Sequence, residues 1–385
     1  MARLGDVFEI QITGEWGSEC TENETGTKVL RTTNFTPEGR ISYDDVVVRS
    51  INESKVEKKR LHCGDIILEK SGGTEKTPVG RVVFCDESIE ESIYLCNNFT
   101  QAMRVNQTIA IPRYVFYFMW NLHCSGRTDL LQNKTTGIRN LQVKSYLNEE
   151  CPLPTLDEQR KIAAVLDKVS SLIAKRRQQL DKLDELVKSR FIEMFDNIKD
   201  EDALINLCTF IDYRGKTPEK AESGLPFITA KNIKMHHMSF DTQEFISKET
   251  YEKVMTRGFP RVGDVVFTTE APLGNVCRIP YIETEFYIGQ RIITMQTEQL
   301  EPAYLEYALS SDEFKRKIAE KSSGSTVTGI RSKLLEQLTI PVPSRALQRQ
   351  FAVFVEHADK SKLAIQMSFD KLEILKKALM QKYFG

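Results

Sequence analysis

The sequence predicts two α/β (α+β) domains in tandem, separated by two long antiparallel coiled-coil helices and related by an internal pseudo-two-fold repeat. Two observations carry this prediction. Residues 151–196 and 340–385 repeat one another without a gap, and both carry a heptad pattern of apolar residues. The stretches before them share short motifs typical of strands and turns. We therefore expect a first domain at 1–150, a first long helix at 151–196, a second domain at 197–340 and a second long helix at 341–385.

The length and composition of the chain fit this division. Its 385 residues correspond to about two or three domains, and 41% hydrophobic with 28% charged residues is ordinary for globular proteins. No apolar run reaches the ~18–20 residues of a membrane-spanning helix, and the sequence starts without a signal-peptide pattern, so we expect a cytoplasmic protein with no membrane partner. Eight cysteines without a Cys-x-x-Cys pair favour reduced thiols over disulfides or zinc ligands.

The repeat extends from the helices into the domains, which we call arm 1 (1–150) and arm 2 (197–340). Thr136-Gly137-Ile138-Arg139 recurs as Thr328-Gly329-Ile330-Arg331, and residues 29–34 parallel 227–232. Gly-Asp turns at Gly64 and Gly263 each lead into an apolar strand. Two arms of one fold that differ in detail are what a molecule needs to read two different half-sites at a fixed distance.

Both repeated segments are expected to be long helices that pack on each other. Their apolar residues follow a 4-3-4-3 spacing, the 3.5-residue period of a coiled-coil seam, and Thr155–Glu158 is a capping box at the start of the first helix. Each helix would be ~40 residues and ~60 Å long. The alternative is that each helix packs only on its own domain. The predicted seam consists of Ile162, Leu166, Val169, Ile173, Leu180, Leu183 and Val187 in the first helix, and Phe351, Val355, Ile365, Phe369, Leu372 and Leu379 in the second.

Charged residues interrupt both seams at matching places. These are Arg176 and Arg190 in the first helix and Lys362 and Lys376 in the second. Seam charges can fix the register of a coiled coil, or they can mark places where the helices splay towards other partners. The sequence leaves both interpretations open.

The sequence contains no pattern of a catalytic or metal site. Gly215-Lys216-Thr217 resembles the end of a phosphate-binding loop, but Phe210 stands where that motif requires glycine. His236-His237 lacks the spacing of a zinc motif. A methyltransferase motif of the Asn/Asp-Pro-Pro-Tyr type and a glycine-rich adenosyl site are also missing from the sequence. We therefore expect no catalytic residue, no metal and no cofactor in this chain.

Polar, basic and glycine-rich loops in the arms are the candidates for binding nucleic acid. Arg and Lys read guanine, Asn and Gln read adenine, and Glu accepts from cytosine, while Ser and Thr suit phosphates. The alternative for each loop is an ordinary solvated turn. The candidates in arm 1 are Arg31, Thr33, Asn34, Lys70, Ser71, Gly72, Gly73 and Lys76. Those in arm 2 are Arg214, Lys216, Thr217, Lys231, Asn232, Thr269, Glu270, Asn275, Gln290, Arg291, Ser325 and Thr326.

Taken together, these motifs resemble the specificity subunit of type I restriction–modification systems over essentially the whole chain. The most specific part is the run 152–167 with its repeat from Pro341. Residues 214–218, 268–276 and 289–291 resemble one class of that family's target-recognition domains, whereas arm 1 matches less specifically. The second helix departs from the family pattern, with Ser344-Arg345 in place of an expected Pro-Leu.

The resemblance implies a non-catalytic subunit that recognises a bipartite site on double-stranded DNA. Each arm would read one half of the site, and the helix pair would set the spacer and dock two modification (methyltransferase) subunits. Those partners would carry the adenine-N6 methylation with S-adenosylmethionine, and restriction/translocase subunits would join for cleavage. The alternatives from the residues are a self-contained DNA-modifying enzyme and a coiled-coil scaffold that binds only proteins.

The charge distribution bears on how such a chain would bind DNA. The 53 basic and 54 acidic side chains are unevenly placed. Residues 1–150 carry 18 basic against 21 acidic side chains and 196–340 carry 18 against 22, whereas 155–195 carry 9 against 7 and 341–385 carry 8 against 4. Because the arms are mildly acidic, we expect weak DNA binding by the isolated chain and tighter binding together with partner subunits.

Overall fold

The computed structural model describes residues 1–21, 25–75, 77–133, 138–215, 217–322 and 329–385. It forms two compact units: unit 1 is Met1–Arg177 with Met367–Gly385, and unit 2 is Gln178–Gln366. Each unit therefore combines one arm with half of each long helix. The predicted division of the chain into four segments is not tested by these two units and stays a prediction.

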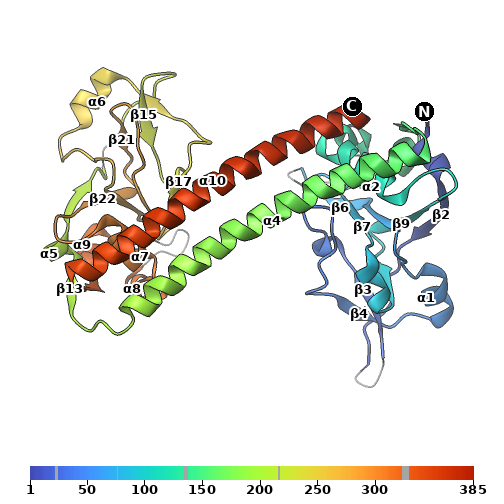
Figure 1. Ribbon diagram of the computed structural model, residues 1–385, viewed down its shortest axis with the longest axis horizontal. Helices are drawn as coiled ribbons and strands as arrows, with labels where there is room; N and C mark the ends of the chain where they lie inside the picture. Colours follow the sequence, from blue (N-terminus) through green and yellow to red (C-terminus); the bar gives the residue numbers. More distant parts are fainter. Residues whose placement is uncertain (22–24, 76, 134–137, 216, 323–328) are drawn as a thin grey trace. The chain divides into compact units, whose positions relative to one another are not determined.

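Arm 1 is built on a four-stranded antiparallel sheet and a three-stranded sheet (Figure 1). The first has the order β2 (Phe8–Thr13), β9 (Thr100–Val105), β5 (Ile66–Glu69), β7 (Val82–Phe84). The second has the order β4 (Val47–Arg49), β3 (Thr27–Leu30), β8 (Tyr94–Cys96), and β3 is parallel to β8. Strand β5 is apolar throughout its first three residues because it is buried on both faces. Ile66 and Leu68 enter one core cluster, and Ile67 enters another.

Arm 2 repeats these two sheets strand for strand. Its four-stranded sheet has the order β14 (Thr209–Asp212), β22 (Ile292–Gln296), β19 (Val265–Thr268), β20 (Val276–Arg278). Its three-stranded sheet has the order β18 (Phe245–Ile246), β15 (Leu225–Ile228), β21 (Tyr287–Ile288), and β15 is parallel to β21. The same alternation recurs in β19, where Val265 and Phe267 enter one cluster and Val266 another. The predicted internal repeat is therefore confirmed at the level of topology.

The remaining elements are short, apart from two helices. Unit 1 also contains β1 (Ala2–Arg3), β6 (Ser71–Gly73), β10 (Gln132–Asn133), β11 (Arg139–Leu141), β12 (Glu150–Cys151), η1 (Leu4–Val7), η2 (Thr32–Asn34), η3 (Glu87–Glu91), η4 (Arg127–Leu131), α1 (Glu53–Lys59), α2 (Pro112–Cys124) and α3 (Val143–Leu147). Unit 2 also contains β13 (Glu201–Ala203), β16 (Ile233–Lys234), β17 (His237–Met238), β23 (Thr339–Pro341), α5 (Leu204–Leu207), α6 (Lys248–Val254), α7 (Pro302–Ser310), α8 (Asp312–Lys321) and α9 (Ser332–Glu336). The long helices are α4 (Leu156–Phe195) and α10 (Arg345–Phe384).

The Gly-Asp turns predicted in both arms are present. Gly64 and Gly263 have φ values of 91° and 90°, a conformation that favours glycine because a side chain would be strained there. Each turn leads directly into one of the two central strands of its four-stranded sheet, β5 in arm 1 and β19 in arm 2. The correspondence of residues 29–34 with 227–232 is also confirmed, because both stretches contain the last residues of the middle strand of a three-stranded sheet and the same tight turn after it.

One repeated motif is out of register with the fold. The N–H of Leu141 donates to the carbonyl of Lys70, as Ile330 does to Thr269, so Leu141 is the structural equivalent of Ile330. The sequence match would instead place Ile138 there. Ile138 is exposed, whereas Leu141 and Ile330 are both buried. The recurrence of Thr136–Arg139 as Thr328–Arg331 is therefore a likeness shifted by three residues, because the buried apolar position decides the register.

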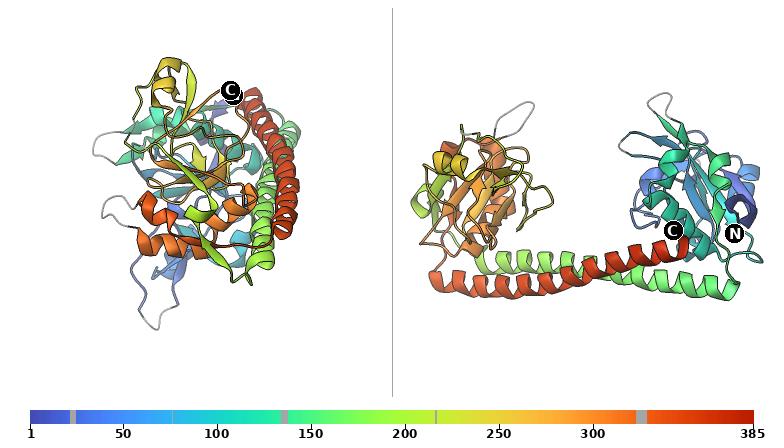
Figure 2. Two further views of the ribbon diagram at one scale, coloured as in Figure 1. Left: turned by 90° about the vertical axis from the view of Figure 1, so that its left-hand side faces the viewer. Right: turned by 90° about the horizontal axis from the view of Figure 1, so that it is seen from above.

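Within each unit, α4 and α10 lie side by side and antiparallel (Figures 1 and 2). In unit 2, Phe191 packs edge-on against Phe351 at 5.4 Å between ring centroids, and Asp184 forms an ion pair with Lys362. In unit 1, the Arg177 guanidinium lies 5.6 Å from the centre of the Phe369 ring. Because the partners' numbers rise on one helix as they fall on the other, these contacts define an antiparallel register. All predicted seam residues are buried or partly buried, as a packed seam requires.

Of the two explanations of the seam charges, register fixing finds an example, and splaying towards other partners stays a prediction. Lys362 pairs with Asp184 across the helices, as a register-fixing charge would. Lys376 instead leaves the seam, and its ammonium lies 3.7 Å from the centre of the Trp120 ring on α2. The helices thus pack both on each other and on the arm of their unit, so the predicted pairing is confirmed and the alternative, packing only on the arm, is wrong.

The start of each long helix is fixed by contacts that repeat in both units. The Thr155–Glu158 capping box is present: the Glu158 N–H donates to the Thr155 hydroxyl oxygen at 3.3 Å, and the Thr155 N–H donates to the Glu158 carboxylate at 3.1 Å. Gln159 is buried, and its side-chain oxygen accepts from the Ile111 N–H at the start of α2 (2.8 Å). Gln348 does the same for the N–H of Glu301 before α7 (2.9 Å). The repeated Gln therefore joins each helix to its arm.

Candidate nucleic-acid interface

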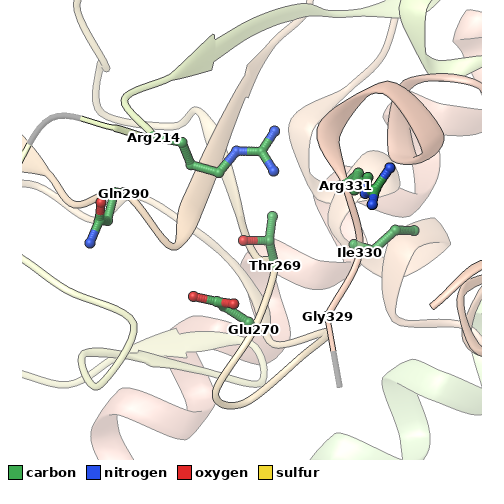
Figure 3. A pocket seen from close by; sticks show the side chains of 7 residues that line it. All are labelled: Arg214, Thr269, Glu270, Gln290, Gly329, Ile330 and Arg331. Atoms are coloured by element: carbon green, nitrogen blue, oxygen red, sulfur yellow. The ribbon is translucent and has the colours of Figure 1, made fainter. Parts of the chain in front are cut away.

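Four of the predicted arm 2 residues meet around one cavity of about 360 Å³ (Figure 3). Arg214 follows the end of β14, Thr269 and Glu270 follow β19, and Gln290 precedes β22. These strands are neighbours in the sheet, so their ends converge at one edge. Gly329, Ile330 and Arg331 complete the lining.

The floor of this cavity is held by backbone hydrogen bonds. Thr269 is buried; its N–H donates to the carbonyl of Arg291 at 2.9 Å, and its own carbonyl accepts from the Ile330 N–H at 3.0 Å. Glu270 and Arg291 form an ion pair at 2.9 Å, from Oε1 to Nε, and about half of each side chain is exposed. The cavity thus presents the carboxylate of Glu270 and two arginines, Arg214 and Arg331, while Arg291 is joined to it through its ion pair with Glu270.

Arg214 is oriented by a carboxylate behind it. Its guanidinium bonds to Asp212 at 2.7 Å, and the Ser332 hydroxyl donates to the same carboxylate at 2.5 Å. Burial raises the pKa of Asp212, but the bonds from Arg214 and Ser332 outweigh it and hold the pKa below its ordinary value. The carboxylate therefore stays charged, and Arg214 is held in place as a fixed hydrogen-bond donor.

Arg331 was not among the predicted site residues, although the sequence offered a signal. It ends a motif that recurs in both arms, and it is exposed. The residue at the end of the first copy, Arg139, lies on β11 beside β6, where Lys70 and Ser71 begin the candidate loop of arm 1. A basic residue that ends a repeated motif was therefore an available clue.

Two predicted readers are structural residues in the described conformation. Asn34 is buried, and its amide bonds to the Arg31 N–H and to the carbonyls of Ser42 and Asp45. Asn232 is buried in the same way, with bonds to the Thr229 N–H and to the carbonyls of Ser239 and Thr242. Both amides close the turn after the first strand of a three-stranded sheet. Direct contact with bases stays untested for them, and their burial argues against it.

The other candidates are scattered over the arms. Asn275 is partly buried and donates to the Ile233 carbonyl at 2.8 Å, so it supports the loop rather than lining the cavity. Thr33, Thr217 and Lys231 are exposed, and Arg31 pairs with Asp45 at 2.7 Å. Lys70, Ser71, Gly72 and Gly73 lie together at the end of β5 and along β6. Lys76, Lys216, Ser325 and Thr326 lie outside the described residues.

Two general findings about the described residues accompany this geometry. No group of three or more His, Cys, Asp or Glu side chains in the described part of the chain could hold a metal ion. Among the helices that the structure describes, none is both long and apolar enough to cross a membrane.

Each arm packs on the two long helices and carries candidate polar residues where strands of its sheet end. Two such arms of one fold define a class of protein: a duplicated recognition protein. The profile of the type I restriction modification DNA specificity domain matches residues 1–185 and 205–372. The chain belongs to this family and is a DNA specificity subunit with two specificity domains in tandem. Subunits of this family are not themselves catalytic.

Individual relatives agree with the family match. The chain is 23% identical over 278 residues to the specificity subunit of type I restriction enzyme MjaVIII of Methanocaldococcus jannaschii, a match that covers 65% of this chain and 64% of that protein, just under two thirds. It is 22% identical over 362 residues to the putative MjaX specificity subunit of the same organism, covering 86% and 80%. The crystal structure of the type I S subunit from M. genitalium superposes with a TM-score of 0.61 at 15% identity, covering 100% and 95%, and so shows the shared fold.

Proposed function

We propose that each arm reads one half of a bipartite site on double-stranded DNA. The observation that carries this proposal is the duplication itself: two sheets of identical strand order end in different side chains at equivalent places. The Arg214, Glu270 and Arg291 cluster of arm 2 supplies the donors and acceptor that read base edges in the major groove. A shared fold with different tips suits two half-sites of different sequence.

The helix pair is the proposed spacer between the half-sites. A 40-residue helix is about 60 Å long, and half-sites one turn of DNA apart have centres about 34 Å apart. Neither helix contains proline after its first turn, so both can act as stiff rods. Residue count in the helices would then decide which spacer length is recognised.

The outer faces of the helices are the proposed docking surface for two modification subunits. Val165, Leu172 and Leu186 of α4 are exposed and lie 7 and 14 residues apart, so they share one face of the helix. Leu375 of α10, the repeat equivalent of Leu186, is exposed as well. Exposed apolar residues in a row favour a protein partner over solvent. An exposed leucine at the same repeat position of both helices also favours two copies of one partner.

Catalysis is assigned to those partners in this proposal. They would bind S-adenosylmethionine and methylate adenine-N6, a reaction that requires the base to be flipped out of the duplex and therefore suits a separate catalytic subunit. Restriction/translocase subunits would join for cleavage. The chain would act in the cytoplasm, where the DNA of its host lies. The mild acidity of the arms supports weak DNA binding by this chain alone.

Sequencing of DNA methylation tests the proposal directly. A host that expresses this chain with its modification subunit should carry N6-methyladenine in one split motif, two short specific halves separated by a fixed unspecific spacer. The same host with the modification subunit alone is the matched control and should lack the motif. A continuous motif, or one that persists without this chain, would contradict the proposal.

A further inference from the structure

The two arms place chemically opposite side chains at one equivalent position. The carbonyl of Phe99 accepts from the Lys70 N–H at 2.9 Å, and the carbonyl of Arg291 accepts from the Thr269 N–H at 2.9 Å. The preceding turns also match: the N–H of residue 100 donates to the carbonyl of residue 97 (3.0 Å), and 292 donates to 289 (3.1 Å). Phe99 and Arg291 therefore stand at the same point, one residue before β9 and β22.

In arm 2 this position carries half of an ion pair suited to one base pair. The ion pair of Arg291 with Glu270 joins Nε of the arginine to Oε1 of the glutamate. About half of each side chain is exposed, so the pair presents hydrogen-bond donors and an acceptor to a ligand. Guanine presents O6 and N7 as acceptors in the major groove, and its paired cytosine presents the N4 amino group as a donor. Donors beside an acceptor therefore complement a G·C pair.

In arm 1 the same position is apolar and uncharged. Phe99 is 47% exposed, a high value for a large aromatic side chain. Its neighbour Gly72 has no side chain to cover the ring; a Cβ there would lie 3.9 Å from ring carbon Cγ. Ser71, which takes the place of Glu270 by the same backbone register, bonds through its hydroxyl to Asn140. The apolar group that DNA offers in the major groove is the thymine C5-methyl.

We infer that Phe99 and Arg291 are paired specificity-determining residues: Phe99 contacts the methyl of a T·A pair in the half-site of arm 1, and Arg291 with Glu270 reads a G·C pair in the half-site of arm 2. This inference rests on the proposed function and adds to it the base pair read at one position of each arm. One backbone position, carried by one fold, thus gives two recognition outcomes.

Base substitution in the recognised duplex tests the chemistry, with the complex of this chain and its modification subunits. Replacing thymine by deoxyuridine removes only the methyl and should weaken binding about fourfold at one position. Replacing guanine by 7-deazaguanine removes the N7 acceptor and should weaken binding about fivefold or more at one position of the other half. Phe99→Ala should abolish the first effect and Arg291→Gln the second. A variant that already lacks the contact loses no further affinity when the base is changed.

Methylation motifs of the same variants give the independent readout. Phe99→Ala should relax one T·A position in one half-site, and Arg291→Gln should relax one G·C position in the other. Val48→Ala is the matched control, because Val48 is an equally exposed apolar residue of arm 1; its motif should equal that of the wild type. Phe99→Leu should relax the position less than Phe99→Ala, because it keeps an apolar group.

The outcomes separate this inference from the proposed function. A split wild-type motif that is unchanged in both variants, or that relaxes at a position other than T·A and G·C respectively, overturns the inference and leaves the proposed function standing. A wild-type motif that is not split overturns both.

Discussion

Shortening the helix pair by one heptad should shorten the DNA spacer. The change deletes 178–184 from α4 together with 362–368 from α10. These segments face each other, because Arg177 lies over Phe369 just outside them and the Asp184–Lys362 ion pair lies within them. After the double deletion, 177 still faces 369 and 185 still faces 361. A heptad is two turns of a coiled-coil helix, so the seam between the two helices stays continuous.

The expected magnitude follows from the geometry of the two helices. Seven residues at 1.5 Å per residue remove about 10.5 Å, and this equals about three base pairs at 3.4 Å each. Because DNA turns about 34° per base pair, the shorter spacer also rotates one half-site by about 100° relative to the other. We therefore expect a spacer about three base pairs shorter and weaker overall methylation.

Sequencing of methylated DNA measures the result. Both half-sites should keep their wild-type sequences, since neither arm is altered, while the unspecific spacer between them becomes shorter. Deleting 178–184 alone is the control: it puts the two helices out of register and should prevent folding. A folded double-deletion variant that methylates the wild-type spacer would refute the idea that the helices set the distance.

The remaining predictions concern the attachment of the arms, one buried lysine and DNA affinity. Gln348→Leu leaves the Glu301 N–H without its buried acceptor and should lower the free energy of unfolding by about 1–3 kcal/mol in urea titrations; equal stability would contradict the role of this bond, and exposed Gln350→Leu is the matched control. Burial lowers the pKa of Lys376 to about 8 from an ordinary 10.5, so the folded protein loses this proton at a lower pH than the unfolded chain does. At neutral pH the buried charge therefore lowers the free energy of unfolding. Lys376→Met should therefore be more stable than the wild type at pH 7, and this advantage should shrink by roughly 2 kcal/mol by pH 9.5; an advantage independent of pH would refute the assignment. The isolated chain should bind its duplex weakly and with a strong salt dependence, and at least tenfold more tightly with modification subunits, in fluorescence anisotropy; equal affinities would show that the arms alone hold DNA.

The sequence predicted the long helices closely because their signals are local and repeated. The capping box at Thr155 specifies where the first helix starts, and the heptad spacing specifies the packed face and the length. The repeat of this pattern 189 residues later specifies the second helix, and α4 and α10 agree with both predictions. The arms were predicted only as a class of fold. Their strands are short and pair across long stretches of chain, as β5 does with β9, so no local pattern specifies the partner or the register.

The candidate site shows the same division. Residue types in polar loops predicted Arg214, Thr269, Glu270 and Gln290, and the fold brings these four together. The same reasoning also selected Asn232, whose amide is buried within its own turn. Composition alone does not distinguish an asparagine that reads a base from one that closes a loop, because both need the same donor and acceptor.

By itself, the sequence determined that the protein is duplicated, that two long helices separate two related arms, and that it resembles a type I specificity subunit. It could do so because periodicity and repetition are properties of the chain read in order. Only the tertiary structure decided which residues are equivalent between the arms: Leu141 with Ile330, and Phe99 with Arg291. The physical reason is that backbone hydrogen bonds between strands fix these positions, and the side chains carried there are free to differ.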